Sequence, residues 1–127
     1  MSWEALNART EILEQIIQEL NRIPGVIEAF LIDRSGIIIA PGNDKDAYTE
    51  KTAAMCAILS GAASAALDEF NKSGPDSIVV ESKECVIVIA DAGPKAILMV
   101  RKDGNDYIEE LLLIAEAKSR RIKEILN

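Results

Sequence analysis

Hydrophobic residues recur at helical spacing in three segments of the chain. In residues 4–23 they fall on one face, with polar side chains opposite. That face carries Leu6, Leu13, Ile17 and Leu20. Pro24 and Gly25 then end this first helix, because proline cannot continue it and glycine tolerates the exit geometry. Similar periodicity predicts a long second helix over about residues 46–71 and a third over about 105–126.

Five short runs rich in β-branched residues lie between these helices. Residues 26–33 and 37–40 are separated by an Asp-Arg-Ser-Gly turn, which predicts a hairpin. Three further runs, at residues 77–81, 85–90 and 96–100, are joined by links short enough for hairpins. Short links imply antiparallel neighbours. The middle runs are apolar at nearly every position, which indicates a sheet covered on both faces.

The order of elements is therefore helix, two strands, long helix, three strands, helix. We find no internal repeat, no low-complexity tract and no linker, so residues 1–127 are expected to form a single domain. The economical architecture is an α/β (α+β) three-layer sandwich with a five-stranded antiparallel sheet. The long middle helix is expected on one face of the sheet, and the N- and C-terminal helices on the other.

The long middle helix has two apolar sides of different character. One side carries Met55, Ile58, Leu59, Ala62, Ala66 and Phe70, and we expect it to face the sheet. The other side carries Ala53, Ala57, Ser60, Gly61, Ser64 and Asp68. Exposed helix faces usually hold Lys, Glu and Gln, whereas a row of tiny residues lets another backbone approach closely. We interpret this second side as a contact with a partner.

Composition narrows the class of partner. The net charge is −7, so a phosphate backbone would be repelled and nucleic acid is not an expected partner. No run of about 18 apolar residues occurs, so no membrane insertion is expected. The first residues lack the basic-then-apolar pattern of a secretion signal, and the chain is therefore expected to be cytoplasmic.

Candidate catalytic groups are few. The chain has no histidine, the commonest general base and transition-metal ligand, and its two cysteines cannot close a zinc site. Cys56 and Cys85 are instead interpreted as buried small hydrophobes. Asp33 and Asp91 both follow predicted strands; they either pair in a cleft as acid and base or open turns, and turn-opening is commoner. We therefore expect no enzyme activity, no metal and no cofactor.

Two further segments allow more than one interpretation. Residues 43–46, with Glu50, place oxygen ligands before a helix, faintly like a calcium loop without its central glycine. N-capping by Asp44 or Asp46 explains the same residues. Trp3 either folds onto the domain or binds something, and the sequence offers no way to choose.

Three stretches of the chain resemble the roadblock (dynein light chain roadblock-type) family. Residues 20–29 are similar to its "leucine, two residues, isoleucine-proline-glycine-valine" segment, and residues 32–40 to its "aspartate, two residues, glycine" hairpin. Residues 53–55 occupy the position of a small-residue motif near the start of the family's long helix. The resemblance extends over about residues 6–125.

The resemblance implies a homodimer that binds a small Ras-like GTPase. In the family, the third strands of two subunits join into one sheet and the long helices lie side by side. Carried onto this chain, the dimer edge comprises Ile78, Val79 and Val80, and the helix contact comprises Ala53, Ala57, Ser60, Gly61 and Ser64. Regulation by favouring one switch arrangement is expected, with an arginine finger at Arg34 as a weaker candidate. A constitutive subunit resembling a motor light chain and a small-molecule sensor remain alternatives.

Overall fold

The computed structural model describes residues 2–42 and 46–127 and contains three helices and five strands in these segments. In chain order they are α1 (Trp3–Asn21), β1 (Val26–Ile32), β2 (Ile38–Ala40), α2 (Ala47–Asp68), β3 (Ser77–Glu81), β4 (Cys85–Asp91), β5 (Ile97–Asp103) and α3 (Ile108–Leu126). The order of elements matches the sequence-based prediction.

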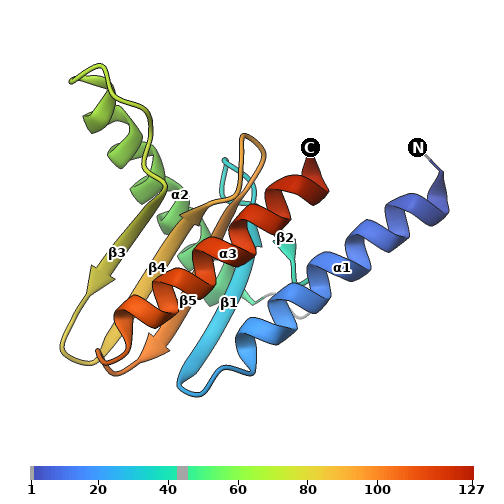
Figure 1. Cartoon of the computed structure of the whole chain (residues 1–127), viewed down its shortest axis with the longest axis horizontal. Coiled ribbons are helices and arrows are strands. Elements are labelled where there is room, and N and C mark those ends of the chain that lie inside the picture. Colours follow the sequence, from blue (N-terminus) through green and yellow to red (C-terminus); the bar gives the residue numbers. More distant parts are fainter. Residues whose placement is uncertain (1, 43–45) are drawn as a thin grey trace.

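The strands form one antiparallel sheet in the order β2-β1-β5-β4-β3, so β2 and β3 are its two edges. Helices α1 and α3 cover one face and α2 lies against the other, as Figure 1 shows. The predicted three-layer sandwich with a five-stranded antiparallel sheet is confirmed. The placement of β1 beside the last strand was not predicted.

The larger core lies between the sheet and helices α1 and α3. The apolar stripe of α1 is buried there, as its periodicity predicts, together with the inner face of α3. The buried helical residues include Leu13, Ile16, Ile17, Leu20, Leu111, Ala115 and Ile122. They pack on alternate residues of the central strands, such as Val86, Val88, Leu98 and Val100.

The smaller core lies between the other face of the sheet and α2. Here the sheet supplies the bulk, through Phe30, Ile32, Ile89, Ile97 and Met99. Among the described residues of α2, only Ala53, Cys56 and Ser60 are buried. The long helix is therefore held on the sheet by small side chains.

Strand β5 runs three residues further than the expected end at residue 100. Arg101 lies opposite Glu28 on β1, and its Nε donates a hydrogen bond of 3.2 Å to the Glu28 carboxylate. Lys102 is buried, and its Nζ donates to Asp106 at 2.6 Å and to the carbonyl oxygen of Asp103 at 3.0 Å. These partners satisfy the charged side chains, so the strand continues through them.

The first half of α1 extends past the end of the sheet (Figure 1). Ser2 caps this helix, with its hydroxyl accepting a hydrogen bond of 3.1 Å from the Ala5 amide. Trp3 is 80% exposed, so it does not fold onto the domain. No helix in residues 2–42 or 46–127 is long and apolar enough to cross a membrane.

Candidate docking surface

The two sides of α2 are oriented in the opposite way to the sequence-based expectation. Ala53 and Ser60, assigned to a partner contact, are buried against the chain's own sheet. Ala57 and Ser64 from the same set are half-buried beside them. Ala53 and Ser60 are therefore unavailable to a partner, and that part of the expected helix contact is wrong.

The large apolar side chains of α2 face outward. Ile58 is 69% exposed, and Phe70, just beyond the helix, is 72% exposed. Met55 and Leu59 are also exposed on this side, together with Ala62 and Ala66. A concentration of large apolar side chains on one helix face of a small domain marks an interaction site. We name Met55, Ile58, Leu59, Ala62, Ala66 and Phe70 the α2 outer face.

A close helix–sheet approach explains the reversal. Phe30, Ile89 and Met99 already fill the space above the sheet, so only small residues fit on the α2 side facing them. The turn between β1 and β2 adds to this crowding. An ideal Cβ on Gly36 would lie 3.0 Å from the Ala54 Cα, and Gly36 has a φ of +94°. Close packing here requires glycine in the turn and tiny residues on the helix.

Gly61 and Asp68 differ from the rest of the small-residue set because both are exposed. They follow Ala54 at intervals of seven residues and thus share its flank of the helix. Since Ala54 lies beside Gly36, that flank faces the β1–β2 turn. The opposite flank carries Leu59 and Ala66.

Replacing Gly61 by alanine is expected to stabilise the isolated domain. A Cβ at this position meets no heavy atom within 4 Å, and alanine favours helix over glycine by about 0.5–1 kcal/mol. Urea unfolding at low protein concentration measures the gain. Gly36→Ala is the matched control, and it should destabilise the domain because of its positive φ and its contact with α2. A loss of stability in Gly61→Ala would contradict the conclusion that Gly61 lies on an uncovered side of α2.

Strand β3 brings a second apolar feature to the surface. Within the described part of the chain it pairs with β4 on one side only, and no strand lies along its other side. Val79 and Val80 are exposed and Ile78 is half-buried, and Ile78 packs into the α2 side of the sheet. An apolar edge strand of five residues is a template for pairing with another chain.

Asp33 and Asp91, the candidate carboxylate pair, each bind other groups near the turns that follow their strands. Asp33 Oδ1 accepts hydrogen bonds from the Ser35 hydroxyl at 2.7 Å, the Ser35 amide at 2.9 Å and the Ile37 amide at 3.0 Å. These bonds, the Ser35 side chain first, hold the pKa of Asp33 below its usual value. Asp91 instead forms an ion pair with Arg34. The two carboxylates do not form an acid–base pair.

Arg34 is engaged within its own chain. Its guanidinium contacts both the Asp91 carboxylate and the carbonyl oxygen of Gly93, which ties the β1–β2 turn to the β4–β5 turn. An arginine finger has to reach outward to a transferring phosphate. The observed contacts give Arg34 a structural role at this end of the sheet.

The acidic segment before α2 contains a helix cap. Asp46 accepts a hydrogen bond of 2.7 Å from the Thr49 amide, and this bond lowers the pKa of Asp46. Asn43, Asp44 and Lys45 lie outside the described residues. Within residues 2–42 and 46–127, no group of three or more acidic or cysteine side chains is placed to hold a metal ion.

Both cysteines are free thiols. Cys56 belongs to α2 and is buried against the sheet, and burial raises its pKa to about 11. A thiol with this pKa is inert at neutral pH. Cys85 is half-buried at the start of β4. Cys56 thus behaves as the small hydrophobe that the sequence predicts.

Residues 12–102 match the model of the Roadblock/LC7 domain, well over half of the chain. The chain belongs to the Roadblock/LC7 domain family. A curated relative of this roadblock domain is the uncharacterized protein MJ0714 of Methanocaldococcus jannaschii, 25% identical over 112 residues, which cover 88% of this chain and 94% of the relative.

Solved structures share the roadblock fold. Gliding protein MglB from Thermus thermophilus superposes with a TM-score of 0.80 at 21% identity, over 93% of this chain and 90% of that chain. The Roadblock/LC7 domain from Streptomyces avermitilis gives 0.79 at 21% identity, over 90% and 97%. Myxococcus xanthus MglB gives 0.73 at 17% identity, over 94% of each chain.

Proposed function

We propose that this roadblock domain is a homodimeric docking module that binds and regulates a small Ras-like GTPase without catalysis of its own. The α2 outer face carries the proposal, because large apolar side chains are exposed there while tiny ones hold the helix to the sheet. Such a face contributes binding energy when a partner covers it. The family resemblance points to a small GTPase as that partner.

Self-association would use the open side of β3. Val79 and Val80 are exposed on this edge, and pairing with a second copy would cover them. The α2 flank that carries Leu59 would approach the second copy's α2. An MglB structure with the same fold has a tetrameric arrangement, which supports self-association in related chains. Ile58 and Met55 remain outward for the GTPase.

Charge favours a basic surface on the GTPase. The chain carries −7, and Glu50, Asp68 and Glu69 lie in or next to α2 as exposed carboxylates. Opposite charge speeds encounter, whereas the apolar centre of the interface determines how long the complex lasts. Because Arg34 is held by Asp91, regulation would work by preferring one switch conformation rather than by inserting an arginine.

Nucleotide-dependent binding tests the proposal. The purified protein is mixed with Ras-like GTPases from its host, each loaded with GDP or with a non-hydrolysable GTP analogue, and analysed by size exclusion with light scattering. We expect one GTPase to bind the dimer at least about 10-fold tighter in one nucleotide state. No complex with any of them would contradict the proposal. Equal affinity in both states would favour the constitutive subunit instead.

A further inference from the structure

The backbone groups of β3 that face the open edge can be identified from two hydrogen bonds. The Asp91 amide donates to the Asp76 carbonyl oxygen at 2.8 Å, and the Ser82 amide donates to the Cys85 carbonyl oxygen at 2.9 Å. Residue pairs that exchange hydrogen bonds alternate along an antiparallel ladder. Ile78 and Val80 therefore point their backbone groups toward β4. The amides and carbonyls of Ser77, Val79 and Glu81 point away from it.

Side-chain faces restrict how two such edges can pair around a two-fold axis. Ile78 and Val80 face the α2 side of the sheet, because Ile78 packs in that core. Ser77, Val79 and Glu81 face the α3 side, since Ser77 and Val79 lie opposite Ala90 and Val88 of the larger core. Directly opposed residues must share a face, so the axis passes through a residue position. Only the pairs whose backbone groups point outward exchange hydrogen bonds, and these alternate with pairs that do not.

Among these registers, the one with its axis at Val79 pairs all five residues of β3 with the five residues of the second copy's β3. It sets Val79 against its own copy, Ile78 against Val80 and Ser77 against Glu81. An axis at Ile78 would place Val80 opposite Asp76, and an axis at Val80 would place Ile78 opposite Ser82. Both alternatives set an apolar side chain against a polar one, whereas pairs of β-branched residues stabilise a sheet.

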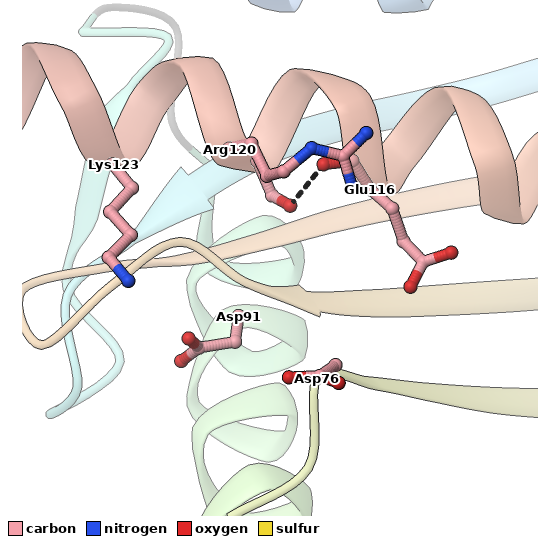
Figure 2. Close-up of a pocket in the computed structure, with 6 residues that line it drawn as sticks. Asp76, Asp91, Glu116, Arg120 and Lys123 are labelled. Atoms are coloured by element: carbon pink, nitrogen blue, oxygen red, sulfur yellow. Dashed lines mark hydrogen bonds between the residues drawn. The ribbon is translucent and has the colours of Figure 1, made fainter.

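A charged hollow of about 300 Å³ lies at the end of the sheet where β3 begins. It is lined by Asp76 and Asp91 from the strand ends and by Glu116, Arg120 and Lys123 from α3. Figure 2 shows Lys123 pointing from α3 toward Asp91, and Glu116 pointing from α3 toward the sheet. Asp91 is neutralised by Arg34, but Asp76 and Glu116 form no ion pair within the described part of the chain.

The β3–β4 turn carries charges of its own. Glu81 ends β3 on the α3 side of the sheet, and Lys83 stands exposed in the turn. In the Val79 register, Ser82 of the second copy lies opposite Asp76, so its Lys83 comes to the end of the sheet that holds the hollow. Glu81 of the second copy lies opposite Ser77, the residue after Asp76, and Asp76 lines the hollow together with Arg120. Neither Lys83 nor Glu81 has an ion-pair partner among the described residues.

From this geometry we infer that each hollow is the socket for the β3–β4 turn of a second copy, with Lys83 binding between Asp76 and Glu116 and Glu81 meeting Arg120. The inference rests on the homodimer of the proposed function and adds its register and its polar contacts. The two-fold axis makes the contact twice in each dimer. The second copy would supply a cation to Asp76 and Glu116, which form no ion pair among the described residues.

Charge reversal tests the socket, with the dimer dissociation constant measured by sedimentation at low salt. Lys83→Glu and Glu116→Lys are each expected to raise this constant about 10-fold, because like charges then meet at two symmetric sites. The double variant Lys83→Glu/Glu116→Lys should return to within about 3-fold of wild type, since it restores opposite charges. Circular dichroism checks that each variant is folded.

Arg121→Glu is the matched control for Lys83→Glu, because it makes the same charge change on the side of α3 near Glu19 of α1. It should leave the dissociation constant within about 3-fold of wild type. The socket is overturned, but the homodimer is not, if the wild type dimerises and Lys83→Glu changes the dissociation constant no more than this control does. The same conclusion follows if the double variant does not recover the wild-type dissociation constant. A wild-type chain that stays monomeric overturns both.

Discussion

Ile58→Glu on the α2 outer face is expected to weaken binding of the small GTPase about 100-fold, because a carboxylate replaces a large apolar contact. The free energy of unfolding of the isolated domain should change by no more than about 0.5 kcal/mol, since the side chain is 69% exposed and supports no internal packing. Titration of the GTPase against wild type and variant measures the first effect, and urea unfolding measures the second.

Leu113→Glu is the matched control for this prediction. Leu113 lies on α3, on the opposite face of the sheet, and is 67% exposed, which nearly equals the exposure of Ile58. The two variants make similar changes in hydrophobicity and charge at equally open helix positions. If Leu113→Glu weakened the complex as much as Ile58→Glu, the GTPase would not be docking on α2.

Val79→Pro is expected to abolish the dimer while leaving a folded monomer. The Val79 amide points to the open edge, so proline removes no hydrogen bond from the monomer. The preceding residue is already extended, as proline requires. In the dimer, the same amide would bond across the two-fold axis, and the proline ring would block both strands. At a protein concentration on the order of tens of micromolar, at which weak homodimers form, sedimentation should show one monomeric species.

Val80→Pro provides the contrast. Its amide points toward β4, so proline removes a hydrogen bond from the sheet itself and should destabilise the domain by about 3 kcal/mol. Thermal unfolding followed by circular dichroism separates the two variants. Equal destabilisation by both prolines, or a dimer that survives Val79→Pro, would mean that β3 is not the pairing edge.

The sequence predicted the elements of the fold because each has a local signature. The stripe of Leu13, Ile17 and Leu20 has helical period, and it is buried as that period implies. The pairing of β1 with β5 has no local signature, because the two strands lie about 70 residues apart and many orders satisfy the same pattern. The opposite charges of Glu28 and Arg101 now mark that pairing.

The orientation of α2 could not be derived from its pattern. Both sides of the helix are apolar, and periodicity gives the angle between them but not which one faces the sheet. The decision depends on how much space the strands leave, and Phe30 and Met99 leave room only for residues such as Ala53 and Ser60. Ile58 is therefore exposed because distant residues on the strands determine which side of α2 fits against the sheet.

Amide hydrogen exchange along β3 of the wild-type protein tests most directly whether two copies pair through this edge. At protein concentrations above the dimer dissociation constant, the amides of Ser77, Val79 and Glu81 should exchange as slowly as those of Ile78 and Val80. On dilution below that constant, the amides of Ser77, Val79 and Glu81 should exchange faster. Free exchange at Ser77, Val79 and Glu81 at every concentration, with Ile78 and Val80 still protected, would show an open edge and contradict the dimer.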